Sequence, residues 1–179
     1  ITDLAAVMTG HVVVPLSPDD SDERLAGILE RCPLRAVLVE GSGRERFARL
    51  AARCPSLRLI VTCDPHPRED ADQPPGEGPT LVDFTDLVAR GATLPEPEVK
   101  PRDQRDLYTL LFTSGSTGVP KGAMRSYATF LAMLETYFIA QPAVHLSFQP
   151  LSHLSERLYQ PAVILGGGVI GFSGGGAHL

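Results

Sequence analysis

Short apolar runs alternate with helical patterns over the first third of the chain. The runs at 11–16, 35–40 and 57–62 are dense in Val, Leu and Ile, which is typical of buried strands. Between them, apolar residues recur at the helical period. This order of strands and helices predicts an α/β fold, in which doubly wound, mostly parallel sheets are flanked by helices.

The two intervening segments carry helix start signals and one apolar face each. Asp20 with Glu23, and Ser42 with Glu45, have the spacing of capping boxes. The two faces consist of Leu25, Ile28, Leu29 and Cys32, and of Phe47, Leu50, Ala51 and Cys54. We therefore expect a strand–helix–strand–helix–strand module over residues 1–63. A further helical pattern, at residues 1–10, precedes its first strand.

Composition then shifts twice without marking an independent domain. Residues 64–79 are rich in Pro, Asp and Gly and predict a surface loop, residues 80–91 predict a short helix, and 92–106 are extended. We interpret 64–106 as a connecting excursion on one α/β body.

The remaining segment, 107–179, begins with a continuous apolar run typical of a central strand. A helix is predicted at 126–138 and a strand leading into a loop at 145–153. A second helix is predicted at 154–167, where Pro161 marks a kink or break, and a final strand at 168–173.

The stretch FTSGSTGVPKG, from Phe112 to Gly122, is the strongest candidate for a site. Glycines let several backbone N–H groups converge on an anion, hydroxyls add donors, and Lys121 adds a positive charge, so the stretch predicts a phosphate-binding loop. A Gly/Ser linker is the alternative, but it explains neither the preceding strand nor the closing Pro-Lys-Gly. The loop matches neither G-x-x-x-x-G-K-[ST] nor G-x-G-x-x-G.

The longer stretch YTLLFTSGSTGVPKGAM resembles the phosphate-loop signature of the adenylate-forming superfamily, the AMP-binding enzymes. Residues 5–40 are similar to an early segment of that family. FQPLSHLSERLYQP, at 148–161, is similar to its next core motif, in the form found in long-chain fatty acyl-CoA synthetases and carboxylic acid reductases. The resemblance covers nearly the whole chain and implies part of the large N-terminal domain of such an enzyme.

The resemblance implies ATP-dependent activation of a carboxylic acid, of the fatty-acid class, to an acyl-adenylate. The acyl group would then pass to a thiol of coenzyme A or of a phosphopantetheine arm. Lys121 would serve catalysis, Thr113 would help to hold Mg²⁺, and His153 would line the acyl pocket near the reacting carboxylate. The implied phosphate-binding residues are Thr113, Ser114, Gly115, Ser116, Thr117, Gly118 and Lys121.

Several alternatives stay open from the sequence. His153 could be only a surface or capping residue, and Glu156 and Arg157 could form an ion pair or a pocket wall. The other histidines show no metal-ligand spacing. The rival functions are the adenylation portion of a carboxylic acid reductase and a nucleotide-binding remnant without catalysis.

Composition and charge limit the classes of partner and the cellular setting that the sequence predicts. The net charge of -5 gives no basic surface for nucleic acid, and no apolar run approaches the length of a membrane span. Three separated cysteines argue against a disulfide framework and for a reducing, cytoplasmic setting. The chain opens on Ile1 and lacks the family's downstream nucleotide contacts and C-terminal lysine, so we expect a fragment that is inactive alone.

Overall fold

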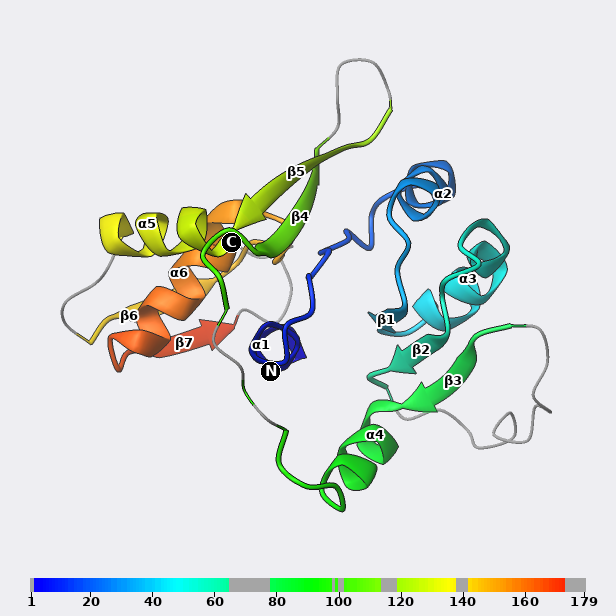
Figure 1. The fold of residues 1–179 in the computed structure, drawn as a ribbon, viewed down its shortest axis with the longest axis horizontal. Coiled ribbons are helices and arrows are strands. Elements are labelled where there is room, and N and C mark those ends of the chain that lie inside the picture. Colours follow the sequence, from blue (N-terminus) through cyan, green and yellow to red (C-terminus); the bar gives the residue numbers. More distant parts are fainter. Residues whose placement is uncertain are drawn as a thin grey trace. The chain divides into compact units, whose positions relative to one another are not determined.

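The structure is a computed structural model that describes residues 2–64, 78–97, 99, 102–113, 119–137 and 142–172. The chain divides into two compact units (Figure 1). One comprises Pro18–Pro97, and the other comprises Ile1–Ser17 with Glu98–Leu179. In the described part of the chain, no helix is both long and apolar enough to cross a membrane.

The unit of residues 18–97 is a parallel three-stranded sheet with strand order β1-β2-β3. Apolar side chains of α2 (Leu25, Ile28 and Leu29) and of the central strand (Ile60) are almost completely buried. Burial of this kind is the main favourable contribution to folding. The elements are α2 (Asp22–Arg31), β1 (Ala36–Val39), α3 (Gly43–Leu50), the 3₁₀ helix η1 (Ala51–Arg53), β2 (Leu59–Thr62), β3 (Thr80–Asp83) and α4 (Phe84–Gly91).

The other unit combines a hairpin with a parallel strand pair. Strands β4 and β5 are antiparallel, whereas β6 and β7 are parallel and are joined by the crossover helix α6. Helices α5 and α6 pack against each other. The elements are α1 (Thr2–Met8), β4 (Leu107–Thr113), β5 (Lys121–Ser126), α5 (Tyr127–Tyr137), β6 (Val144–Ser147), α6 (Leu154–Leu165) and β7 (Val169–Phe172).

The predicted α/β fold with parallel sheets and flanking helices is confirmed. The capping box predicted at Ser42 is wrong, since Ser42 makes no side-chain cap hydrogen bond, and three further local predictions were wrong. Residues 11–16 do not form a buried strand, since only Val13 makes a β-bridge, to Thr109. Pro15 has no N–H with which to continue the ladder. Residues 80–83 are not the start of a helix. They form β3, whose backbone pairs with the edge of β2 that β1 leaves free. The third error concerns the start of α2.

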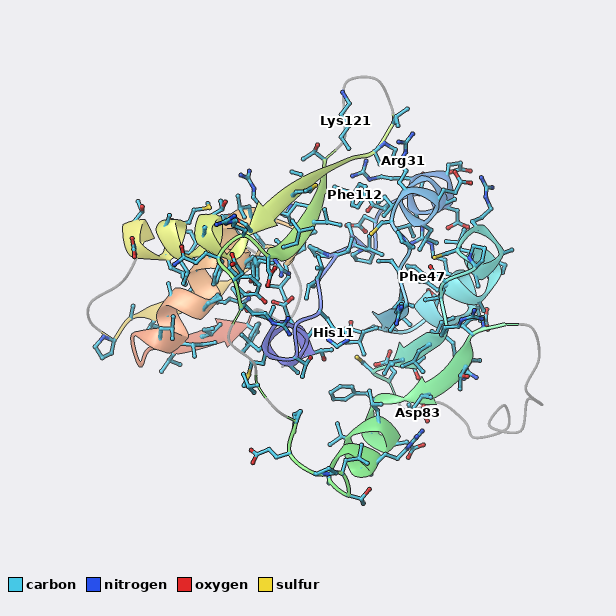
Figure 2. All side chains as sticks on the ribbon, in the orientation of Figure 1. His11, Arg31, Phe47, Asp83, Phe112 and Lys121 are labelled. Atoms are coloured by element: carbon cyan, nitrogen blue, oxygen red, sulfur yellow. The ribbon has the colours of Figure 1, made fainter. Side chains whose placement is uncertain are left out.

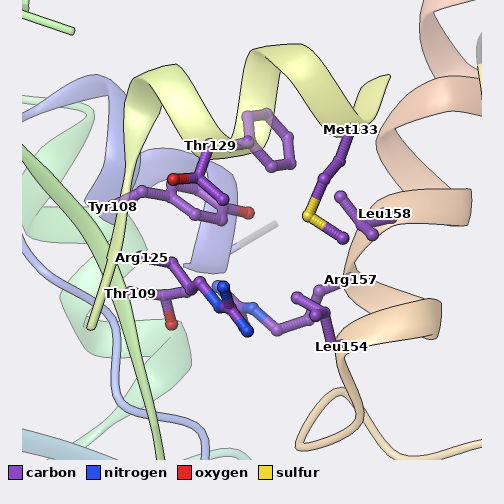
Figure 3. A pocket seen from close by; sticks show the side chains of 9 residues that line it. Tyr108, Thr109, Arg125, Thr129, Met133, Leu154, Arg157 and Leu158 are labelled. Carbon is purple, nitrogen blue, oxygen red and sulfur yellow. The ribbon is translucent and has the colours of Figure 1, made fainter. Parts of the chain in front are cut away.

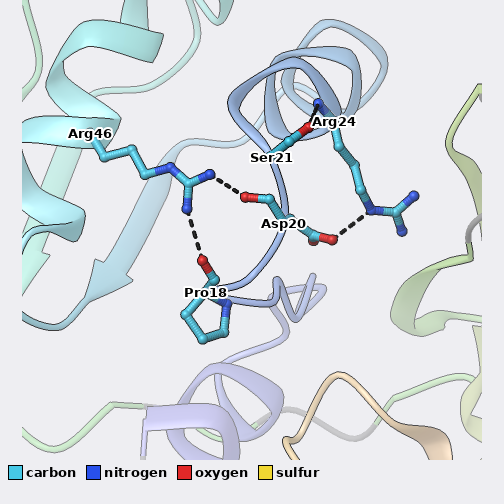
Figure 4. A network of polar contacts seen from close by, with 5 residues as sticks. All are labelled: Pro18, Asp20, Ser21, Arg24 and Arg46. Carbon is cyan, nitrogen blue, oxygen red and sulfur yellow. Dashed lines mark hydrogen bonds and ion pairs between the residues drawn. The ribbon is translucent and has the colours of Figure 1, made fainter.

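Helix α2 begins one residue later than the capping pattern indicates. Ser21 is its N-cap, and the Ser21 hydroxyl accepts a hydrogen bond of 3.2 Å from the backbone N–H of Arg24 (Figure 4). The Asp20 carboxylate instead accepts from Arg24 Nε at 2.7 Å. Arg46 from α3 donates to the carbonyl oxygens of Pro18 and Asp20, which fixes the entry to the helix.

Two further features differ from expectation in informative ways. Residues 121–126, to which the sequence patterns assign no strand, form β5 because β4 offers them an unpaired edge. Helix α6 continues through Pro161 to Leu165. Proline has no backbone N–H, so the helix loses one hydrogen bond at Pro161. Burial of Leu158, Ala162 and Val163 on the same helix offsets the free energy of that lost bond.

The cysteines behave as core or partly buried thiols. Cys32, Cys54 and Cys63 are all free thiols. Cys54 is only 2% exposed. Burial is the main influence that raises the pKa of the Cys32 and Cys63 thiols, so both stay protonated at neutral pH.

Candidate active site

The hairpin β4–β5 presents the candidate phosphate loop. Thr113, the last residue of β4, is the cross-strand partner of Lys121, the first residue of β5. The pairing therefore brings both ends of the Gly-rich motif together at the mouth of the connecting loop, where Figure 2 shows Lys121. The predicted phosphate ligands Ser114, Gly115, Ser116, Thr117 and Gly118 lie outside the described residues.

The next residue pair explains why a glycine follows the lysine. Phe112 lies opposite Gly122 in the register of the hairpin. A Cβ atom at Gly122 would lie 3.2 Å from Cζ of the Phe112 ring, which is closer than ordinary packing allows. Gly122 thus lets the ring lie across the neighbouring strand. Deeper in the strand, Tyr108 and Leu111 anchor β4 in the core.

The two described candidates in this motif are available to an external ligand. Thr113 and Lys121 are both exposed. Lys121 forms no ion pair with any residue in the described ranges, and the Thr113 hydroxyl forms no hydrogen bond there. A hydroxyl and an ammonium group at the mouth of one loop form a suitable pair of donors for phosphate oxygens.

His153 stands at the start of α6, on a different element of the same unit. It is the N-cap residue, with φ -88 and ψ 133, and its backbone N–H donates to the Pro150 carbonyl at 2.9 Å. Its side chain makes no capping hydrogen bond and is exposed. The imidazole is therefore not required for the helix start, and it is accessible to a ligand.

Glu156 and Arg157 do not pair with each other, so the ion pair that the sequence left open does not form. Glu156 is 1% exposed and accepts hydrogen bonds from Nε2 of His145 at 3.0 Å and from Nε2 of Gln160 at 3.1 Å. Arg157, 2% exposed, donates to the Asp3 carboxylate at 2.9 Å. Both side chains fix α6 to neighbouring elements.

The electrostatics of Glu156 reflect this hydrogen bonding. Burial alone would raise the pKa of its carboxyl, but hydrogen bonds from Ser147, Gln160 and His145, with the charge of His145, outweigh burial and hold the pKa below its ordinary value. Glu156 is therefore ionised at neutral pH. The sequence could not identify His145 as the partner of Glu156, because the two side chains come within reach only when β6 packs on α6.

A small cavity lies behind the hairpin, and no sequence pattern indicated it. It is lined by side chains from β4, β5, α5 and α6, among them Tyr108, Arg125, Met133 and Arg157 (Figure 3). The guanidinium of Arg157 lies over the Tyr108 ring, 5.4 Å from its centroid. No group of three or more His, Cys, Asp or Glu side chains suited to a metal ion occurs among the residues placed by the structure.

Comparisons with known proteins agree with the geometry. The model of the AMP-binding enzyme family matches residues 1–179. The peroxisomal long chain acyl-CoA synthetase 7 of Arabidopsis thaliana is 28% identical over 177 residues, which cover 96% of this chain and 25% of that protein. The chain spans about a quarter of the length of the curated relatives it matches.

Solved structures show the same relationship. The adenylation domain of a carboxylate reductase from Mycobacterium chelonae superposes with a TM-score of 0.80 at 28% identity, covering 97% of this chain and 29% of that one. A didomain of the carboxylic acid reductase from Segniliparus rugosus, solved in complex with AMP, gives a TM-score of 0.81 at 25% identity. It covers 97% of this chain and 27% of that one.

Proposed function

Because the chain belongs to the AMP-binding enzyme family, we propose that it serves the ATP-dependent activation of a carboxylic acid to an acyl-adenylate. The observation that carries this proposal is the pairing of Thr113 with Lys121, which closes the Gly-rich motif into a hairpin loop with two exposed phosphate donors. The AMP bound to the similar reductase didomain supports a nucleotide as the ligand.

In the first step, a carboxylate oxygen attacks the α-phosphorus of ATP, a new O–P bond forms, and the bond to the β-phosphate oxygen breaks. Negative charge grows on the leaving pyrophosphate. Lys121 and the Thr113 hydroxyl, held at the loop mouth by strand pairing, would stabilise that charge without having to reorganise. The backbone of residues 114–118 would add N–H donors.

Mg²⁺ fits this site as an ion held mainly by the phosphates. Magnesium commonly keeps several waters and takes one or two protein oxygens, and the Thr113 hydroxyl would supply one such ligand. When bound, the ion would neutralise phosphate charge. In the described ranges no carboxylate cluster competes for this role.

His153 would act on the acid side of the reaction. Its exposed imidazole at the start of α6 would border the acyl pocket and orient the attacking carboxylate. The substrate would be a fatty acid, as the names of the curated relatives suggest. Precise placement of the nucleophile is a large source of rate, because small displacements are costly.

The acyl group would then pass to a thiol. Coenzyme A is the acceptor suggested by the acyl-CoA synthetase relatives. A phosphopantetheine arm is the alternative acceptor. The similarity to adenylation domains of carboxylic acid reductases is the observation that supports this alternative. Offering both acceptors to the acyl-adenylate and measuring thioester formation distinguishes them.

The central test is Lys121→Ala, made in the full-length protein and measured as pyrophosphate exchange at saturating acid. Loss of one charge-assisted donor to a developing charge should raise the barrier by about 2–4 kcal/mol, a fall in rate of roughly 30- to 1,000-fold. Binding of the acid should change much less, because Lys121 faces phosphate in this proposal.

Arg105→Ala is the matched control, since it removes a positive charge from a side chain that is 96% exposed in a turn. It should leave exchange unchanged. An unaltered exchange rate in Lys121→Ala would refute the role of the lysine. Complete absence of exchange in the unsubstituted full-length protein would favour the non-catalytic remnant instead.

A further inference from the structure

Four polar side chains at the junction of β6 and α6 form a hydrogen-bonded cluster that the proposed reaction does not use. They are His145 and Ser147 from β6, and Glu156 and Gln160 from α6. Nε2 of His145 donates to the Glu156 carboxylate at 3.0 Å. Nε2 of Gln160 donates to the same carboxylate at 3.1 Å and to the Ser147 hydroxyl at 3.0 Å. The Ser147 hydroxyl gives Glu156 its third donor.

This cluster fixes the first turn of α6 on β6. Glu156 and Ser147 are buried, and hydrogen bonds to a buried carboxylate are among the stronger and more directional ones in proteins. The His145 ring adds a second contact, because it stacks on the ring of Tyr159, with centroids 5.7 Å apart and an angle of 28° between the planes. A carboxylate with three donors from two elements favours one arrangement of those elements.

The helix start that the cluster holds is built in an unusual way. Glu156 is the third residue of α6, where the carboxylate of a capping box would accept from the backbone N–H of the N-cap residue. Here the N–H of His153 donates to the Pro150 carbonyl instead, and the Glu156 carboxylate bonds to β6. Histidine is not a favoured N-cap residue, and the His153 side chain makes no capping hydrogen bond. Neither side chain therefore stabilises this helix start in the usual way.

We propose that His145 and Glu156 are positioning residues for the activation of the acid: by fixing the first turn of α6 they set where the exposed imidazole of His153 lies. This inference rests on the proposed role of His153 at the acid site. Glu156 itself would not touch the substrate, because it is buried and engaged by three donors. A functional side chain is held most precisely when hydrogen bonds and packing support the regular element that carries it.

The test compares His145→Leu with His145→Gln in the full-length protein. Leucine removes the donor to Glu156, whereas the glutamine amide keeps an N–H donor at a similar reach. We expect His145→Leu to slow pyrophosphate exchange by up to roughly 100-fold and to raise the KM for the acid, because small displacements of a positioned group are costly. ATP affinity should stay unchanged, and His145→Gln should recover most of the rate. His11→Leu, at an exposed histidine, is the control and should change none of these quantities.

A double-mutant cycle with His153→Ala separates positioning from a general loss of structure. If His145 acts through His153, His145→Leu should have little further effect on the rate once His153 is alanine. An equal fall in both backgrounds would overturn the proposal, and so would an unchanged rate in His145→Leu. If His145→Leu does not fold, Gln160→Met replaces it in the cycle, because it removes another donor to Glu156 from a partly exposed position.

Failure of this inference can be told apart from failure of the proposed function. If the unsubstituted full-length protein supports no exchange, or if His153→Ala behaves like it, the role of His153 is wrong and the positioning role is refuted with it. If His153→Ala slows exchange but His145→Leu does not, only the positioning role is refuted.

Discussion

At the scale of single residues, the two candidate catalytic side chains face different chemistry. Lys121 ends the hairpin loop, and His153 begins α6, so one is placed for phosphate and the other for the acid in our proposal. Neither is bound to another described side chain. Each can therefore be changed without breaking a contact that the structure shows, and a change in activity can be interpreted directly.

In the full-length protein, His153→Ala should lower the rate of adenylation and alter the preference among acids, while ATP affinity stays nearly constant. The physical reason is that a misplaced carboxylate slows attack without touching the phosphates. The measurement is a panel of acids of different chain length, with ATP binding determined separately.

His11→Ala is the control, because His11 is an exposed histidine whose Nδ1 lies 3.0 Å from the nearby Thr9 hydroxyl. It should leave both quantities unchanged. A selective loss of ATP affinity in His153→Ala, with the acid profile intact, would move His153 to the nucleotide site.

At the scale of elements, the starts of α2 and α3 offer a matched comparison. Ser21 and Ser42 are both N-cap residues, but only the Ser21 hydroxyl accepts a helical N–H. Ser21→Ala should therefore lower the free energy of unfolding by about 1 kcal/mol. Ser42→Ala should change it by much less, since no capping hydrogen bond is lost.

Chemical denaturation of the two variants measures this difference. Equal effects at the two serines would mean that the capping hydrogen bond of Ser21 contributes nothing to stability. The network of Asp20, Arg24 and Arg46 around the same helix start should be unaffected, because none of its hydrogen bonds uses the Ser21 side chain (Figure 4).

At the scale of the whole molecule, Glu156 makes stability depend on pH. Its folded-state pKa is lowered, so its contribution is complete above the ordinary carboxyl range, about pH 4–5. The contribution is lost as pH falls through that range toward the folded-state pKa, because the unfolded chain takes up the proton first.

Glu156→Gln should reduce the free energy of unfolding at neutral pH by about 1–3 kcal/mol, since it removes a buried charged acceptor. It should also flatten the acid-side decline in stability. Denaturation curves at several pH values measure both effects. Glu135→Gln, at an exposed position of α5, is the control, and an equal flattening in that variant would refute the assignment to Glu156.

Much of the fold could be predicted because apolar runs and the periodicity of apolar residues are local features of the sequence. The patterns at 35–40 and 57–62 became β1 and β2, and the apolar face of Leu25, Ile28 and Leu29 became core. The prediction of a buried strand at residues 11–16 was wrong because a run of valines does not show whether a neighbouring strand is available for pairing. Only one bridge, from Val13 to Thr109, forms there.

The sequence by itself determined the family and the phosphate-loop motif, since both depend on residue types at fixed spacing. Only the tertiary structure decided which residues meet. Residues 121–126 became a strand because β4 presented an edge, and this placed Lys121 opposite Thr113. Glu156 and Arg157, adjacent in sequence, acquired separate partners in His145 and Asp3. Such pairings join residues from different elements, and packing, not local propensity, brings them within reach of a hydrogen bond.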